Sequence, residues 1–237
     1  MIRLGYPMGR NFARKYGVRY LYFTIPKHIW DKKIKEVRIL PKCDGLYFEI
    51  GYIYIQQPVE AELNKDSYLS IDLGLDNFAA CISTNGTSFI MEGRGIKSFN
   101  RWWNKEKAKV QSIYDKQGIK KGRKLCYLFR KRKNVINEYM NKNVQYIIQY
   151  CLKNKIGNIV IGELKNIKQN INIGRKNNQN FVNIPHNLFK QKIKSKCELY
   201  GIEYIETSES YTSQECSQCR IIDKTNRKHR GLYTCKN

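Results

Sequence analysis

The chain has 237 residues, of which 41% are hydrophobic, and its 44 Lys and Arg against 20 Asp and Glu give a formal net charge of +24. That apolar content is enough for a packed core and excludes a disordered basic tail. No run approaches the roughly 18 consecutive apolar residues of a membrane span, and no apolar segment follows the basic N-terminus as a secretion signal requires. We therefore expect a protein of the reducing cytoplasm without membrane contact. The charge predicts a polyanionic partner, and nucleic acid is favoured over an anionic membrane surface.

The first part of the chain has the pattern of antiparallel strands. Apolar and polar residues alternate, with many β-branched and aromatic side chains, at 18–25, 34–40 and 46–57. The Asp44-Gly45 pair between the last two segments is typical of a hairpin turn. An apolar run at 68–73 then predicts a buried strand, which is followed by a Gly-containing turn, a second strand and a third at 87–91.

Helical periodicity begins at about residue 98 and continues to 155, with a break near 117–122. A strand at 158–164, a loop at 165–180, a helix at 185–200 and a strand from residue 202 follow. This order of elements predicts a mixed α/β sheet with helices on its faces.

Positive charge is densest in the central helical region. Apolar residues recur every three to five positions from 135 to 151 and predict a packed face, so that 130–133 should face outward. The alternative is a solvated helix face without a partner. The candidate contacts to a nucleic-acid backbone are Arg123, Lys124, Arg130, Lys131, Arg132 and Lys133.

Two carboxylates have conspicuous positions. Asp72 lies inside an apolar strand, where an unpaired buried charge would cost several kcal/mol, and Glu163 closes the apolar strand 159–163. Strands of this type pair at the centre of a sheet, so the two acids could meet at one edge and bind Mg²⁺, of which a pair clamps the attacking and leaving oxygens of a phosphodiester. The alternative is that Asp72 caps a turn through the amides of Gly74 or Leu75, while Glu163 is a surface acid.

The C-terminus carries a metal-ligand spacing. Cys216 and Cys219 form a C-x₂-C pair, and Cys235 follows at a separation suited to a zinc ribbon. Structural zinc takes four ligands, and His229 is the one nearby imidazole that offers an alternative for the fourth. A redox role of the pair lacks the strand-to-helix setting that such motifs have. The other cysteines are isolated and predicted to be buried small apolar residues: Cys43, Cys81, Cys126, Cys151 and Cys197.

Three stretches taken together are similar to a known family. They read IDLGLDNFAACIST, RKRKNVINEYMNKNVQYIIQYCLKNKIGNIVIGEL and NIPHNLFKQKIKSKCELYGIEYIETSESYTSQECSQC. In this order they resemble the C-terminal half of the TnpB (OrfB) transposon-associated proteins, and the resemblance covers about 34–237. It implies a RuvC-like nuclease domain in a transposon-encoded, prokaryotic, RNA-guided DNA endonuclease, with guide RNA and target DNA as partners.

The resemblance also implies roles for single residues. Asp72 matches the first catalytic aspartate and Glu163 the catalytic glutamate, both as Mg²⁺ ligands. Cys216, Cys219 and Cys235 match three of the four cysteines of the family's zinc ribbon. The strands before Asp72 resemble the distal part of the family's wedge β-barrel.

The expected fold is therefore α/β, an RNase H-like (RuvC-like) mixed sheet with flanking helices, preceded by part of a β-barrel and followed by an incomplete zinc ribbon. The expected domains are 1–66, 67–210 with a basic helical insertion at about 98–155, and 211–237. Two family segments have no counterpart here, the recognition region and a D-x-N-A-A segment with a third catalytic aspartate. We expect a fragment truncated at both ends, with one or two Mg²⁺ ions, the second poorly held, an incomplete Zn²⁺ site and weak or no cleavage alone.

Two other functions remain open from the sequence. One is a non-catalytic nucleic-acid-binding protein, either a degenerate copy or a regulator. The other is a RuvC-type resolvase that acts on branched DNA without a guide, which the ribbon and the ESYTSQ segment fit poorly.

Overall fold

The computed structural model describes residues 3–120, 122–162, 184–208, 214–216, 218–229 and 232–236. The chain divides into two compact units, 1–57 and 58–237. The three-part division expected from the sequence stays a prediction. No helix in the described ranges combines the length and apolarity that crossing a membrane would require.

The first unit consists of two antiparallel hairpins. Strands β1 (Arg3–Pro7) and β2 (Tyr20–Thr24) pair across the short helix α1 (Arg10–Tyr16), and β3 (Ile34–Lys42) pairs with β4 (Tyr47–Tyr54). A 3₁₀ turn, η1 (Lys27–Ile29), connects the hairpins. Cys43, Asp44 and Gly45 have positive φ in the β3–β4 turn, which confirms the expected position of this turn. The sequence pattern predicted neither β1 nor α1. The β-barrel interpretation stays a prediction.

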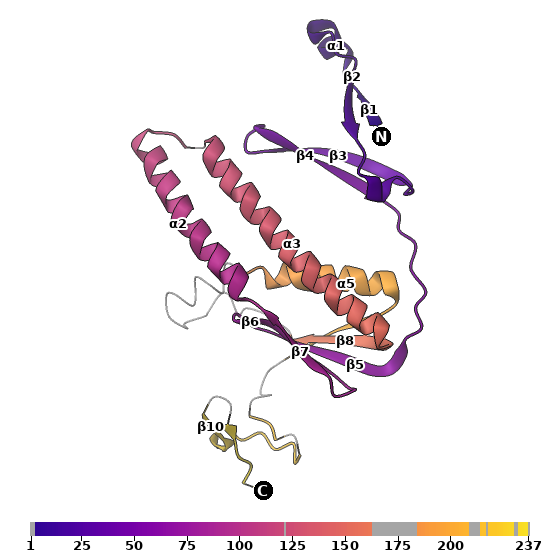
Figure 1. Ribbon diagram of the computed structural model, residues 1–237, viewed down its shortest axis with the longest axis vertical. Helices are drawn as coiled ribbons and strands as arrows, with labels where there is room; N and C mark the ends of the chain where they lie inside the picture. The colour runs from indigo at the N-terminus through magenta and orange to yellow at the C-terminus, as the bar shows by residue number, and fades with distance from the viewer. Residues whose placement is uncertain are drawn as a thin grey trace. The chain divides into compact units, whose positions relative to one another are not determined.

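The second unit is built on a five-stranded mixed sheet with the order β7-β6-β5-β8-β9 (Figure 1). Strands β5 (Asn64–Leu73), β6 (Asn77–Ser83) and β7 (Ser88–Glu92) form an antiparallel meander. Strands β8 (Ile156–Gly162) and β9 (Glu203–Thr207) extend the sheet in parallel with β5. The expected mixed α/β sheet is confirmed.

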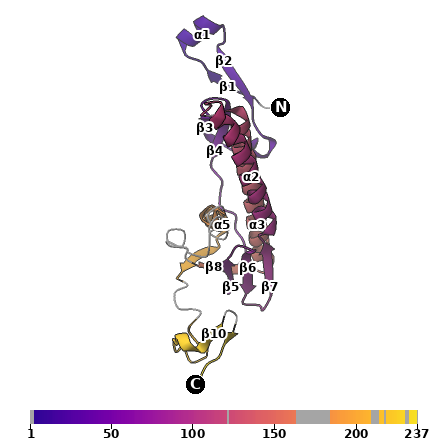
Figure 2. The same cartoon turned by 90° about the vertical axis from the view of Figure 1, so that its left-hand side faces the viewer.

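Three long helices accompany the sheet among the described residues: α2 (Arg94–Lys116), α3 (Arg123–Lys153) and α5 (His186–Tyr200). Figures 1 and 2 both show α2 and α3 side by side as a helical hairpin, with α5 against the second half of α3. Residues of α3 at helical spacing enter the core against the sheet, where Met140, Ile147 and Cys151 are fully buried. The break between the two helices lies where the sequence pattern placed it.

The two faces of β5 differ in burial. Leu69, Ile71 and Leu73 point into the helix-covered core, whereas the alternate residues Ser70 and Asp72 are exposed in the described part of the chain. The sequence expectation of a wholly buried strand was therefore wrong for one face. Asp72 lies at the end of the strand in an exposed position, so that burial places no charge penalty on it.

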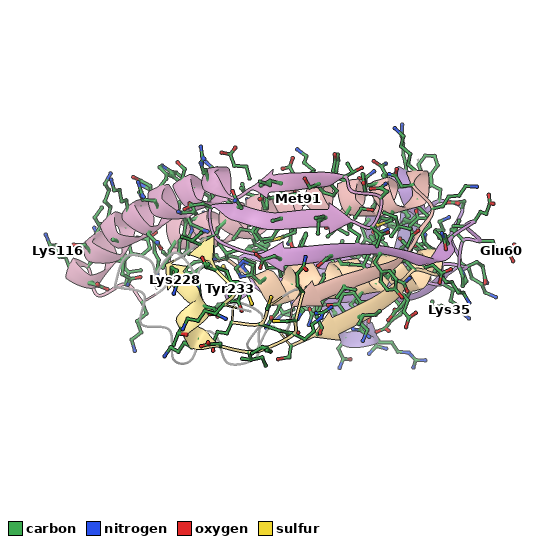
Figure 3. All side chains as sticks on the ribbon, turned by 90° about the horizontal axis from the view of Figure 1, so that it is seen from below. Lys35, Glu60, Met91, Lys116, Lys228 and Tyr233 are labelled. Atoms are coloured by element: carbon green, nitrogen blue, oxygen red, sulfur yellow. The ribbon has the colours of Figure 1, made fainter. Side chains whose placement is uncertain are left out.

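The α2–α3 hairpin extends beyond the sheet and has its own small core. In Figure 3, Met91 marks β7 in the sheet, and Lys116 marks the far end of α2. Trp103, Val110, Leu125 and Leu128 are buried together, and the Trp103 indole donates a hydrogen bond of 3.0 Å to the Leu128 carbonyl. This core explains why so polar a hairpin holds its shape away from the main core.

Candidate functional site

The first part of the candidate site is the Asp72 carboxylate. The register pairs Ile71 of β5 with Ile161 of the parallel strand β8, so Asp72 directly follows the last paired position. The Gly74 amide donates to the Phe78 carbonyl at 3.1 Å, so it is not available for a cap by Asp72. Among the residues that the structure describes, none forms a hydrogen bond or ion pair with the Asp72 carboxylate. Asp72 is exposed, and carboxylate oxygen atoms are the ligands that a hard cation takes.

The turn after Asp72 requires glycine. A Cβ added to Gly74 would lie 2.5 Å from the Asn77 carbonyl oxygen, closer than real Cβ contacts allow. The chain turns tightly here from β5 into β6, which leaves Asp72 at the carboxyl end of β5. We call this end, together with Gly162 at the end of β8, the carboxyl edge of the sheet. Glu163, the second predicted carboxylate, lies outside the described residues and directly follows Gly162 in the sequence.

Helix α5 contributes two polar side chains at the carboxyl edge that the sequence analysis missed. His186 is fully buried, and its Nε2 lies 3.0 Å from the carbonyl oxygen of Gly74. Lys190 lies one turn further along α5, and its Nζ donates to the carbonyl oxygen of Gly162 at 3.3 Å. The available signal was a lysine within an apolar helical pattern, next to Phe189 and followed by Ile193 and Cys197.

The Lys190 ammonium is paired as well as buried. Its side chain is 9% exposed and lies 2.6 Å from Glu206 Oε2 on β9, whose other oxygen accepts a hydrogen bond of 2.8 Å from the Tyr204 hydroxyl. Burial raises the pKa of Glu206, but the hydrogen bonds from Lys190 and Tyr204 outweigh it and hold this pKa below its ordinary value. Burial and the hydrogen bond to Glu206 raise the pKa of the Tyr204 phenol. Lys190 and Glu206 therefore form an ion pair at neutral pH.

The second part of the candidate site is a cluster of thiols. The sulfur atoms of Cys216, Cys219 and Cys235 lie within 4.8 Å of one another, and the Cys219 and Cys235 Sγ atoms are 3.6 Å apart. Four thiolates around zinc at the usual Zn–S distance have sulfur atoms separated by about 3.8 Å. The three cysteines therefore fit three corners of a structural zinc site.

Local backbone structure brings the three thiols together. The Cys216 amide donates to Ile221, and the Arg220 amide donates to Cys216 at 2.9 Å, with Arg220 in a left-handed conformation. Strands β10 (Arg227–His229) and β11 (Leu232–Tyr233) then pair, so that Cys235 follows the end of a hairpin. A 3₁₀ turn, η2 (Lys224–Asn226), precedes them and is capped by the carboxylate of Asp223. The side chain of His229 lies outside the described residues.

The backbone around Cys216 favours its thiolate. Amide hydrogen bonds from Cys219 and Gln218 lower the pKa of the Cys216 thiol to about 7. Burial, in contrast, raises the pKa of the Cys81, Cys151 and Cys197 thiols to about 12. These three cysteines and Cys126 are buried as predicted, whereas Cys43 is only half-buried. The chain therefore separates ligand-competent cysteines from inert ones.

The third part is the basic face of the α2–α3 hairpin. Helix α3 carries all six candidate cations. Arg123, Lys124, Arg130 and Lys133 are exposed, as expected of an outward face, whereas Lys131 is half-buried. Arg132 is half-buried, donates to the Asn100 side chain at 2.9 Å and lies over the Trp103 ring at 4.7 Å. Burial lowers the pKa of the Arg132 guanidinium. The expectation that all of 130–133 face outward was wrong because an aromatic surface on α2 draws part of this run inward.

Exposed aromatic rings accompany these cations. Lys131 lies 4.6 Å from the centre of the Trp102 ring, and Arg130 lies 6.0 Å from that of Tyr127. Trp102, Tyr127 and Phe129 are each more than a third exposed. Cations and aromatic faces on one surface are the usual composition of a nucleic-acid-binding platform. The sequence signal was the Trp102-Trp103 pair followed by lysines at helical spacing.

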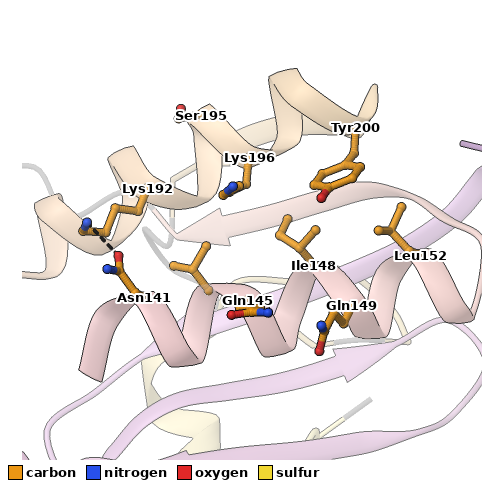
Figure 4. A pocket seen from close by; sticks show the side chains of 10 residues that line it. Asn141, Gln145, Ile148, Gln149, Leu152, Lys192, Ser195, Lys196 and Tyr200 are labelled. Carbon is orange, nitrogen blue, oxygen red and sulfur yellow. Dashed lines mark hydrogen bonds between the residues drawn. The ribbon is translucent and has the colours of Figure 1, made fainter. Parts of the chain in front are cut away.

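A cleft of about 560 Å³ lies between α3 and α5 (Figure 4). Val144, Ile148 and Leu152 provide its apolar side chains, and Lys192 donates a hydrogen bond to Asn141 at 2.8 Å across it. Its lining contains no carboxylate, whereas a second cleft, near the first residues of β8 and β9, is lined in part by Glu60, Glu198 and Glu203.

Comparisons with known proteins find relatives for most of the chain. Residues 52–168 match the family OrfB_IS605, described as "Probable transposase", and residues 186–237 match the Cas12f1-like TNB domain. The CRISPR-associated endodeoxyribonuclease Cas12f1 of Syntrophomonas palmitatica is 26% identical over 186 residues, which is 75% of this chain and 36% of that protein. The Cas12f1 of Sulfoacidibacillus thermotolerans is 28% identical over 200 residues, 80% of this chain and 45% of that protein.

A solved structure shares the fold. The cryo-EM structure of a CRISPR-Cas12f ternary complex superposes with a TM-score of 0.53 at 18% identity, covering 81% of this chain and 38% of that one. The protein is thus a mixed α/β protein of the kind found in Cas12f. The two family matches and the Cas12f1 relatives then support a TnpB-like (OrfB) family for this chain. The chain spans less than half the length of these relatives.

Proposed function

We propose that the protein acts as a metal-dependent nuclease, in which an RNase H-like (RuvC-like) core hydrolyses phosphodiester bonds of DNA selected by a guide RNA. The observation that carries this proposal is the position of Asp72. Its carboxylate is exposed at the carboxyl end of a central strand, beside the end of a parallel strand that leads into Glu163. Carboxylates on neighbouring parallel strands meet at one edge of a sheet, which is the arrangement that a divalent cation needs.

In this proposal each part of the site has a separate task. Asp72 and Glu163 hold Mg²⁺, which when bound neutralises charge on the phosphodiester and lowers the pKa of its water ligand. The exposed Arg and Lys residues of α3 neutralise backbone phosphates and orient the strand at the carboxyl edge. Cys216, Cys219 and Cys235 hold Zn²⁺ and stabilise the C-terminal hairpin rather than taking part in hydrolysis.

Guide RNA and target DNA are the proposed partners. The net charge of +24 favours polyanions, and the curated relatives are named endodeoxyribonucleases. The aromatic rings on the α2–α3 hairpin favour unpaired bases, because stacking needs an open base face. The resemblance to TnpB proteins supports a guide.

The test is metal binding and cleavage by the full chain. Binding of Mn²⁺ is measured by electron paramagnetic resonance, and cleavage is measured on labelled single-stranded DNA with Mn²⁺ or Mg²⁺. Asp72→Asn should lose the tightest Mn²⁺ site and any cleavage. Asp66→Asn is the matched control, since Asp66 is exposed on the same strand at the opposite end. Equal Mn²⁺ affinity in wild type and Asp72→Asn would refute the proposed metal site.

A nucleic-acid-binding protein without catalysis is the second candidate. The observation that favours it is the basic, aromatic surface of the α2–α3 hairpin, which does not depend on Asp72. This candidate predicts salt-dependent RNA binding that Asp72→Asn leaves unchanged, together with no Mn²⁺ site and no cleavage in the wild type.

A further inference from the structure

We propose that His186 and Lys190 of α5 are positioning residues, which fix the separation of the ends of β5 and β8 and thereby the placement of Asp72 in the proposed metal site. This inference rests on the proposed function and adds to it two residues of the helix-covered face of the sheet. Neither residue touches the reacting atoms in this arrangement. Both act through backbone carbonyls next to the candidate ligands.

The first tether joins α5 to the end of β5. His186 Nε2 lies 3.0 Å from the carbonyl oxygen of Gly74, two residues after Asp72. The imidazole is fully buried and stacks on Phe78 with a ring separation of 5.6 Å and an angle of 9°. Phe78 in turn contacts Phe189 and Tyr139 edge-on. A ring held so closely on its neighbours has one orientation, and its hydrogen bond defines the position of the Gly74 carbonyl.

The second tether joins α5 to the end of β8. Lys190 Nζ donates to the Gly162 carbonyl, directly before Glu163, and is held in place by Glu206 at 2.6 Å. Burying a lysine ammonium is costly unless it is paired and hydrogen-bonded, and the ion pair with Glu206 compensates this cost. An apolar side chain would fill the same space without that cost. Packing alone therefore does not explain why a charged lysine occupies this position.

The geometry of the two tethers matches the sheet. The pairing of β5 with β8 ends at Ile71 and Ile161, one residue before Asp72 and Gly162. His186 and Lys190 lie one turn apart on α5, and their hydrogen bonds reach both strand ends. Helix α5 therefore holds β5 and β8 together just beyond the last backbone pairing between the two strands.

The separation of the strand ends matters because metal binding tolerates little displacement of a ligand such as Asp72. Outer-shell groups that orient metal ligands typically contribute about 10–100-fold to metal affinity. We expect Lys190→Met to weaken the Asp72-dependent Mn²⁺ site of the full chain about tenfold, with a comparable loss for His186→Leu. Lys196→Met is the matched control, because Lys196 is exposed on the same helix.

Conservative substitutions that restore the hydrogen bonds distinguish a positioning role from a general effect on stability. Lys190→Arg keeps a cationic donor near Gly162, and His186→Gln keeps an amide donor near Gly74, so both should restore most of the Mn²⁺ affinity. Melting temperatures and circular dichroism are recorded for every variant, and affinities are compared well below the lowest melting temperature. If His186→Leu does not fold, Lys190→Met carries the test, since methionine has a similar shape to the lysine stem.

Each outcome decides the inference. A tenfold loss in Lys190→Met with recovery in Lys190→Arg supports the positioning role. Asp72-dependent Mn²⁺ binding that Lys190→Met leaves at wild-type strength refutes the positioning role alone. A loss that Lys190→Arg fails to recover also refutes it, since a donor at Gly162 would then not suffice. Wild-type Mn²⁺ binding that does not depend on Asp72 refutes the proposed function together with this inference.

Discussion

Zinc binding by the thiol cluster should depend steeply on pH and on Cys219. The ligand form of cysteine is the thiolate, and the pKa of Cys216 is about 7. This thiol is therefore ionised in about one molecule in ten at pH 6 and about nine in ten at pH 8. Its ionisation alone should raise the apparent zinc affinity about tenfold over this interval. Every further ligand that must lose a proton steepens the dependence.

The substitution to test is Cys219→Ser. It removes a sulfur that lies 3.6 Å from Cys235 and leaves the backbone turn in place. Removing a direct ligand should weaken binding by more than the roughly 10–100-fold that is typical when an outer-shell group is removed. Cys43→Ser is the matched control, because Cys43 is half-buried in a turn of the first unit and lies outside the cluster.

The assay is competition for zinc with a chromogenic chelator at pH 6, 7 and 8, with limited proteolysis of the C-terminal segment alongside. Wild type and Cys43→Ser should bind zinc with the same rising pH profile, and Cys219→Ser should bind it far more weakly. Zinc should slow cleavage of the segment in the first two proteins only. A pH-independent affinity, or equal affinities in Cys219→Ser and wild type, would show that these thiols are not the ligands.

Three further predictions concern packing, backbone and charge. Phe189→Ala should lower the free energy of unfolding by about 3–5 kcal/mol in urea titrations, because Phe189 is fully buried in the core between α5 and the sheet. Gly74→Ala should lower the melting temperature because its Cβ would meet the Asn77 carbonyl, whereas Gly95→Ala, which meets nothing within 4 Å and lies in α2, should not lower it. Substituting both Arg130 and Lys133 by Ala should reduce the slope of log K against log[salt] for single-stranded RNA by about 1.4, at about 0.7 for each phosphate that is no longer neutralised, and an unchanged slope would identify a solvated face.

The main elements of the second unit were predictable because each has an unambiguous periodicity. The apolar pattern of α3 repeats at helical spacing for most of its length, and the polar segment around Gly118 separates α3 from α2. The metal-ligand spacing of Cys216 and Cys219 was likewise a local signal, and the structure brings the distant Cys235 to them. Such local patterns determine the element whatever its tertiary contacts, so the sequence alone predicts it.

Other features depend on contacts that no local pattern encodes. Lys190 is buried because Glu206, on a different strand, provides its counter-charge. Arg132 turns inward because Trp103 on the neighbouring helix offers a ring. Buried and exposed residues alternate along β5, but the short apolar run in the sequence did not reveal this alternation. In the first two cases the deciding partner is distant in the sequence, so propensity and spacing alone could not identify it.

The mixed pairing of the sheet also bears on how the chain reaches its native state. Strand β5 meets β6 across one tight turn, whereas its parallel neighbour β8 comes after residues 74–155. Local contacts form faster than distant ones, so we expect the β5–β6–β7 meander and the α2–α3 hairpin to precede the docking of β8. The carboxyl edge of the sheet exists only after that docking. A partly folded chain would therefore expose its basic hairpin before the strand ends that carry the proposed metal site have come together.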